Sequence, residues 1–133
     1  MREERVVAAA RGVVGVRFRL QGRDPAYGLD CVGVAAVALR AGGYSGPVPE
    51  GYALRTGAFD DEVCGLAACN GDRAGDLLLC RAGPGQLHLV VLTGAGFVHA
   101  DAGLRRVVER PGVVPWPVMR AWRIDEGDDL WRR

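Results

Sequence analysis

One cysteine and the two histidines of this chain are its best-suited residues for nucleophilic chemistry. Cys31 stands in the Gly28–Gly33 string at the start of an apolar run, and His88 and His99 lie far downstream in two apolar segments. A thiol that the fold can bring to an imidazole base is the equipment of a cysteine nucleophile. Because the chain has one serine and no lysine, a serine hydrolase or a lysine-based mechanism has almost no residues to use.

The surroundings of Cys31 favour a reactive thiol. Asp30 is a good helix N-cap, and Cys31 is then the first residue of the helix. Its sulfur would face unpaired backbone N–H groups and the positive end of the helix dipole, which both stabilise a thiolate. Gly33 would let another backbone approach this helix closely. The alternative is a buried structural thiol, the interpretation that we keep for the cysteines with apolar neighbours, Cys64, Cys69 and Cys80.

Either histidine alone is more typical of a core residue, but the pair is more informative. Gly94–Gly96 predicts a tight hairpin turn between them. With a two-residue loop, His88 and His99 lie on one face of the sheet as diagonal neighbours, roughly 7–8 Å apart at their backbones. A loop of odd length would place them on opposite faces. The sequence leaves both loop lengths open.

The three side chains suggest a division of labour. His88 would take the proton of Cys31, or hold it in a thiolate–imidazolium pair. His99 would form a hydrogen bond with the far nitrogen of His88 and so fix its tautomer and orientation. The backbone N–H of Cys31 would help to stabilise an oxyanion.

The bulk composition limits the classes of partner. A chain of 133 residues predicts a single domain spanning residues 1–133, and 49% hydrophobic residues can build a core. A net charge of +1, from 17 basic and 16 acidic residues, gives no reason to expect a nucleic acid or an anionic membrane as partner. The arginines are scattered along the chain. We expect no cofactor and no bound metal.

The N-terminal residues 1–16 carry several charges around the short apolar run Val6–Ala10, which is not typical of a signal peptide. No apolar stretch approaches the length that spans a bilayer. We therefore expect cytoplasmic synthesis, no membrane insertion and free thiols. A thiol–metal module is a further alternative, but no C-x-x-C pair supports it. Its ligands would be Cys64, Cys69, Cys80 and a histidine.

Hydrophobic periodicity and turn residues predict helices first and strands after them. The predicted helices are Glu3–Val14, Cys31–Ala41 and Asp60–Ala68, with a short strand at Arg17–Leu20. The predicted meander comprises Asp76–Arg81, Leu87–Thr93, Phe97–Ala100 and Leu104–Glu109, followed by a last strand at Met119–Ile124. We therefore expect an α+β domain in which N-terminal helices, including the core helix opened by Cys31, pack on a C-terminal antiparallel sheet.

With these residues placed, the chain resembles the NlpC family of papain-like bacterial cell-wall cysteine peptidases. Gly28–Gly33 is similar to the nucleophile motif of that family, Gly-x-Asp-Cys-Ser-Gly. Three further motifs follow in the family order: Gly75–Leu79, His88–Leu92 and Phe97–Ala100. The order of cysteine before histidine differs from the permuted acyltransferase relatives. Four motifs in order make the resemblance specific.

The resemblance implies a papain-like fold with Cys31 as nucleophile, His88 as base and His99 as third member. It implies hydrolysis of peptidoglycan stem peptides, typically between D-γ-glutamate and diaminopimelate. Asp30 resembles an aspartate that in some members binds the free amine of a trimmed stem peptide, beside its role as helix cap. Two positions depart from the family pattern, because Val32 replaces the usual serine and Phe18 the usual tyrosine. Tyr27 is the candidate to substitute for that tyrosine.

The segment Arg17–Pro25 looks most like family members encoded with phage tails or gene transfer agents. That resemblance implies phage-like tail proteins as partners, and a particle that carries the peptidase to the cell envelope. The alternative within the same fold is a non-catalytic tail component that has a structural role or binds the cell wall.

Overall fold

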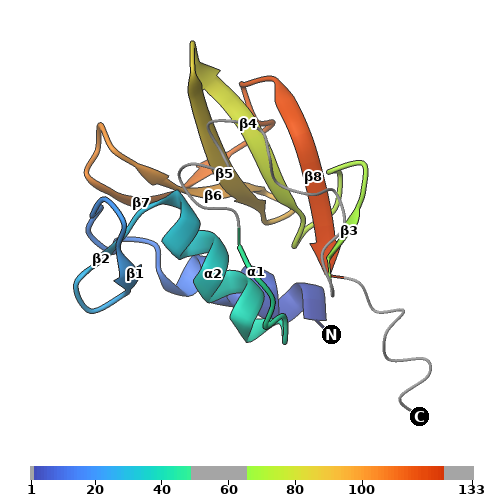
Figure 1. Ribbon diagram of the computed structural model, residues 1–133, viewed down its shortest axis with the longest axis horizontal. Coiled ribbons are helices and arrows are strands. Elements are labelled where there is room, and N and C mark those ends of the chain that lie inside the picture. Colours follow the sequence, from blue (N-terminus) through green and yellow to red (C-terminus); the bar gives the residue numbers. More distant parts are fainter. Residues whose placement is uncertain (1, 49–65, 125–133) are drawn as a thin grey trace.

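The helices lie together on one face of an antiparallel sheet (Figure 1). The computed structural model describes residues 2–48 and 66–124. In these ranges the helices are α1 (Arg2–Gly12) and α2 (Cys31–Ala41). They pack against each other, and α2 also contacts the sheet. The predicted α+β class, with helices packed on an antiparallel sheet, is confirmed.

The described strands form a six-stranded sheet and a separate two-stranded ribbon. The ribbon pairs β1 (Arg23–Asp24) with β2 (Gly28–Leu29) just before α2. The order in the sheet is β3-β8-β4-β5-β6-β7, and every neighbouring pair is antiparallel. The strands of the sheet are β3 (Leu66–Ala68), β4 (Leu77–Gly83), β5 (Gln86–Leu92), β6 (Gly96–Asp101), β7 (Arg106–Pro111) and β8 (Val118–Ile124).

The strands from β4 to β7 follow one another as the predicted meander. The last strand, β8, does not extend the meander beyond β7. It returns to the other edge of β4, where Leu77 pairs with Trp122. Because β7 and β8 are separated in the sheet by β6, β5 and β4, the connection between them, residues 112–117, must pass these three strands.

Two sequence-based predictions were wrong in the described residues. Leu66–Ala68 was expected to end a helix but forms β3, in which Leu66 pairs with Ile124 of β8; the rest of the predicted helix, residues 60–65, lies outside the described residues. The segment Arg17–Leu20 is no regular strand. It makes only isolated bridges, to Arg106 and to Leu29. In both places a partner remote in sequence decides the backbone conformation.

Helix α2 begins and ends where its capping residues predict. The Asp30 carboxylate accepts a hydrogen bond from the Gly33 N–H at 2.9 Å, which satisfies one free donor of the first turn. Gly42 caps the C-terminus, and Gly43 follows with a φ of +96°. The helix is buried along most of its length, as expected for an apolar helix in a core.

Alternate residues of the strands face two separate apolar clusters. The larger cluster lies between the helices and the sheet and includes Val34 and Leu39 of α2 with Leu89 and Val91 of β5. The smaller cluster lies on the other face of the sheet. It consists of Leu78, Cys80, Val90, Phe97 and Ala121, with Cys69, Leu92, Val114 and Trp116 packed at its margin. The connection between β7 and β8 thus covers this second cluster.

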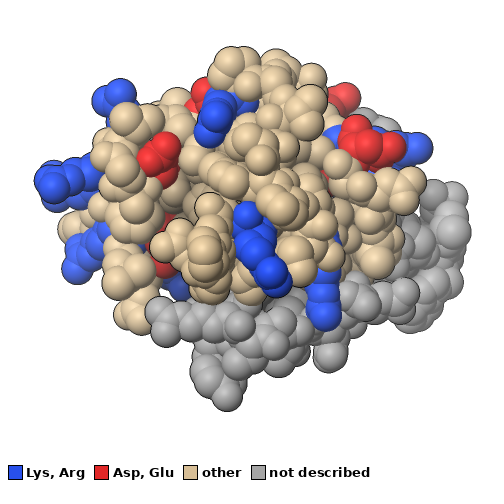
Figure 2. Space-filling model, turned by 90° about the horizontal axis from the view of Figure 1, so that it is seen from above, with Lys and Arg blue, Asp and Glu red and all other residues tan. Residues whose placement is uncertain are grey.

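Charged side chains are dispersed among uncharged ones on the face seen in Figure 2, and some basic and acidic groups lie side by side. No helix in residues 2–48 and 66–124 is long and apolar enough to cross a bilayer.

Candidate active site

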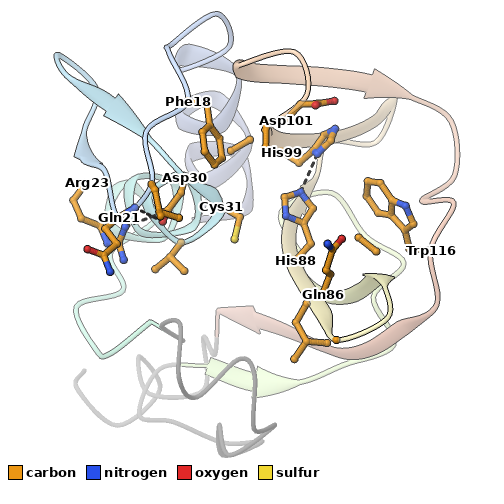
Figure 3. A pocket seen from close by; sticks show the side chains of 17 residues that line it. Phe18, Gln21, Arg23, Asp30, Cys31, Gln86, His88, His99, Asp101 and Trp116 are labelled. Carbon is orange, nitrogen blue, oxygen red and sulfur yellow. Dashed lines mark hydrogen bonds and ion pairs between the residues drawn. The ribbon is translucent and has the colours of Figure 1, made fainter.

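The N-terminus of α2 faces β5 and β6 across a cleft of about 950 Å³ (Figure 3). Cys31 and Asp30 line it from the start of α2, His88 from β5 and His99 from β6. The structure therefore brings together four of the five site residues that the sequence predicts. The exception is Tyr27, which does not line the cleft.

The turn between the two histidines has the even length that places them on one face. Thr93 N–H donates to the Gly96 carbonyl at 2.9 Å, so the loop consists of Gly94 and Ala95. The backbone pairing of β5 with β6 then covers only Leu92↔Phe97 and Val91↔Val98. The two histidines lie beyond this paired stretch, toward the cleft.

The imidazole rings of the two histidines are joined by a hydrogen bond. Nε2 of His88 lies 2.9 Å from Nδ1 of His99, and the ring planes are nearly perpendicular, at 85°. One of these nitrogens donates and the other accepts. If His88 is the donor, its Nδ1 carries a lone pair and can act as a base.

Burial keeps both imidazoles uncharged at neutral pH. Desolvation is the main cause that lowers the pKa of His88 to about 4, and the electrostatic interaction with His99 adds to it, although Asp101 and Asp30 act in the opposite direction. Desolvation also lowers the pKa of His99; Asp101 opposes this effect and Arg110 adds to it. In the resting protein, His88 is thus a neutral imidazole that can accept a proton, and not an imidazolium.

The thiol of Cys31 experiences opposing influences. Burial is the largest and raises its pKa, and the charge of Asp30 adds to this effect. Backbone N–H groups of Leu89 and Val32 lower the pKa, and Arg23 lowers it slightly further. Only the Val32 N–H belongs to the helix start and acts as the sequence predicts; the Leu89 N–H, the stronger of the two, comes from β5, and burial outweighs both. The resting pair is a neutral thiol beside a neutral imidazole.

Asp30 connects the helix start to the neighbouring loop. Its Oδ1 accepts from Gly33 N–H at 2.9 Å and from the Arg23 guanidinium at 2.8 Å, while its Oδ2 accepts from Gln21 N–H at 2.8 Å. Gln21 has a φ of +61°, an uncommon conformation for a residue other than glycine. Asp30, the residue directly before the thiol, thus holds the loop with Gln21 and Arg23 that forms one wall of the cleft.

The two positions that depart from the family pattern both line the cleft, namely Phe18 and Val32. Tyr27 lies between β1 and β2 with 66% of its surface exposed. A role of Tyr27 in substrate binding stays a prediction.

Trp116 is a cleft residue that sequence reasoning did not assign to the site. Its indole ring lies 5.6 Å from the His88 ring and 5.5 Å from the His99 ring, measured between centroids. The sequence around Trp116 carries no motif that relates it to the histidines. Only the return of β8 to β4 brings the connection over them.

Residues 2–48 and 66–124 contain no group of three or more His, Cys, Asp or Glu side chains that could hold a metal ion. Cys69 and Cys80 are free, and Cys80 is fully buried. Cys64, the third thiol of the metal alternative, lies outside the described residues.

These groups can perform acyl transfer: a thiol, a neutral base and a group that orients the base share one cleft. Among known proteins, no family model and no curated protein matches the chain. Among solved structures, the NlpC/p60 domain of the peptidoglycan hydrolase SagA is similar, with a TM-score of 0.51 and 23% sequence identity. The match covers 82% of this chain and 88% of that one. The chain therefore has the NlpC/p60 fold.

Proposed function

We propose that this protein is a cysteine peptidase, related to the NlpC family, that hydrolyses amide bonds in peptidoglycan stem peptides. The observation that carries the proposal is the hydrogen bond between His88 and His99 in the cleft that Cys31 also lines. The similar solved structure belongs to a protein described as a peptidoglycan hydrolase, which supports the same class of substrate.

The tautomer of the histidine pair determines whether His88 can act as a base. We infer that His88 donates its Nε2–H to Nδ1 of His99, which leaves the lone pair of His88 Nδ1 for the thiol. His99 then carries its own proton on Nε2. A neutral third member suffices because a thiol is much more acidic than a hydroxyl group.

The reaction follows from this arrangement. As the Cys31 sulfur attacks the amide carbonyl carbon, its proton passes to Nδ1 of His88. When the C–N bond breaks, the imidazolium returns that proton to the leaving amine, and a thioester remains on Cys31. Water then attacks the thioester and gives a proton to His88. The Cys31 thiolate leaves as the carboxylic acid forms, and it then recovers its proton from His88.

The start of α2 supplies the electrostatic support for the intermediate. The backbone N–H of Cys31 points from the helix N-terminus and would donate to the oxyanion. Because the free thiol has a raised pKa, proton transfer accompanies attack instead of preceding it. The active form is therefore created only with substrate in the cleft.

The resemblance in the nucleophile motif supports the bond between D-γ-glutamate and diaminopimelate as the site of cleavage. Asp30 would contribute mainly by holding the cleft wall, because its carboxylate already accepts from three donors. A substrate amine would compete with these donors. Tyr27 would contact only a substrate that extends beyond the cleft.

The segment Arg17–Pro25 supports delivery by a phage-like particle after synthesis in the cytoplasm. Part of it, including Phe18 and Arg23, lines the cleft. Co-sedimentation of the protein with tail structures from the producing cells tests this part of the proposal.

The central test compares three proteins on purified muropeptides, with products identified by mass spectrometry. We expect the native protein and Cys69→Ala to cleave, and Cys31→Ala to be inactive. Cys69 is a suitable control because it is also a free, partly buried thiol but lies outside the cleft. Equal product from the native protein and Cys31→Ala would exclude the mechanism.

The masses of the products identify the bond. A new amine on diaminopimelate and a new carboxyl on the γ-glutamyl side indicate the proposed cleavage. If no muropeptide is cleaved while the protein still binds sacculi, the non-catalytic alternative is correct.

A further inference from the structure

Among the residues that the structure describes, the His99 side chain has a single hydrogen-bond partner, His88. His99 is 4% exposed, its Nδ1 faces His88, and its buried Nε2 has no hydrogen-bond partner among the described residues. One hydrogen bond leaves a ring free to tilt about that contact. The orientation of His99 must therefore come from the side chains packed around it.

Those neighbours are aromatic, and one of them touches both imidazoles. Trp116 meets the His88 ring at 90° and the His99 ring at 67°. It also lies 5.8 Å from the ring of Phe97. These centroid distances and angles are those of favourable edge-to-face contacts. The Arg110 guanidinium lies over the indole ring of Trp116, 5.9 Å from its centroid, in a cation–π contact.

The backbone holds Trp116 in place from both sides. Its neighbours Pro115 and Pro117 have restricted φ angles. The Pro117 carbonyl accepts from Arg81 N–H of β4 at 2.9 Å, and Gly112 N–H donates to the Ala95 carbonyl at 3.1 Å. The connection is thereby fixed both to β4 and to the turn between the histidines.

We propose that Trp116 is a positioning residue, whose indole ring orients the His88–His99 pair and excludes water from the hydrogen bond that the two rings share. This role in catalysis rests on the proposed peptidase function, but the packing itself does not. Trp116 touches the base and its orienting group, and it takes no part in proton transfer.

The proposal has a consequence for the protonation of His88. The charged groups that act on the pair are Asp30, Asp101 and Arg110. All three remain when Trp116 is truncated, although Arg110 loses its contact with the indole ring, so the main change at His88 is its burial. Because burial is the main cause of the lowered pKa of His88, exposure to water should raise that pKa from about 4 toward 6.5.

Nuclear magnetic resonance can measure this effect directly, since the chain has only two histidines to assign. In the native protein we expect the His88 ring to titrate near pH 4. In Trp116→Ala it should titrate higher by about one pH unit or more, and Trp116→Phe should restore the native behaviour. Trp116→Leu, which keeps apolar bulk, should show a smaller rise and serves if the alanine variant does not fold. An unchanged His88 titration in the folded alanine or leucine variant would overturn the proposal.

Trp122→Leu is the matched control for Trp116→Leu. Trp122 is fully buried in the cluster between helices and sheet, so its truncation should lower the melting temperature without moving the His88 titration. A similar shift in both variants would indicate general loosening and contradict a specific role of Trp116.

Kinetics separate this proposal from the proposed function. If muropeptides are cleaved, Trp116→Ala should lower kcat more than it changes KM and should move the acid limb of the pH profile upward with the titration. If the native protein cleaves nothing, the peptidase proposal fails, while the titrations still decide whether Trp116 positions the pair.

Discussion

Nε2 of His88 and Nδ1 of His99 lie 2.9 Å apart and share a single proton in the neutral pair. Only the tautomer with this proton on His88 leaves the Nδ1 of His88 available to a thiol. His99 thus decides which ring nitrogen of His88 carries the proton, although His99 contacts no reacting atom in the proposed mechanism.

Replacement of His99 should separate orientation from basicity. We expect His99→Ala to lower kcat on muropeptides by up to the roughly 10²–10⁴-fold that a positioned base contributes. His99→Asn should retain more activity, because its amide oxygen can accept from His88 Nε2–H. Steady-state kinetics of both variants provide the measurement. Equal activity of His99→Ala and the native protein would show that no orienting partner is needed.

Activity should persist at unusually low pH for a histidine-based enzyme. The reaction needs neutral His88, so kcat/KM falls as pH decreases through the lowered pKa of about 4, not through 6.5. A pH–rate profile measures this acid limb. An acid limb near 6.5 would contradict a buried, uncharged base.

Stability should decline over the same interval in which activity persists, between pH 6.5 and 4. The unfolded chain binds a proton at an ordinary histidine pKa, while His88 in the fold does not until about pH 4. The contribution of neutral, buried His88 to the free energy of unfolding is therefore fully present above pH 6.5, and it declines as the pH falls toward 4. Circular dichroism at each pH confirms that loss of activity is not loss of fold.

Gly33 should not tolerate a side chain. A Cβ atom at this position would overlap the backbone oxygen of Gly22, in the loop that Asp30 holds. We expect Gly33→Ala to lower the free energy of unfolding by about 1–3 kcal/mol, the usual cost of overpacking. Urea denaturation measures it. Gly12→Ala is the control, because a Cβ there meets nothing within 4 Å; an equal loss in both variants would contradict the explanation.

Asp76 should be essential for folding rather than for chemistry. It is fully buried and accepts two hydrogen bonds from Arg123, at 2.8 and 2.9 Å. Asp76→Asn should cost roughly 3–5 kcal/mol, because a buried pair loses one charge. Asp72 also contacts Arg123, at 3.4 Å, but its side chain is 66% exposed. Asp72→Asn should therefore cost about 0–1 kcal/mol in the same denaturation experiment; similar losses would show that burial does not matter here.

Local signals in the sequence predicted the parts of the site that local contacts build. Asp30 and Gly42 set the bounds of α2 through capping. The glycine-rich turn after Thr93 set the register of the hairpin once its length was known. These features depend on neighbours within a few residues, so composition and spacing specify them.

The remaining features depend on partners remote in sequence. Leu66–Ala68 has no periodicity of its own and becomes a strand because β8 lies beside it. Trp116 joins the site because β8 returns to β4. The lowered pKa of His88 comes from burial by several elements at once. None of these has a short-range signature that a sequence pattern could reveal.

The proline residues on both sides of Trp116 also affect what happens before any substrate arrives. Proline narrows the conformations of the unfolded chain, so fixing this stretch costs less conformational entropy than fixing a flexible loop. The wall of the cleft that it forms is consequently preorganised. An incoming peptide then spends little of its binding energy on ordering the enzyme at this wall, and more of it is available to strain and align the scissile amide.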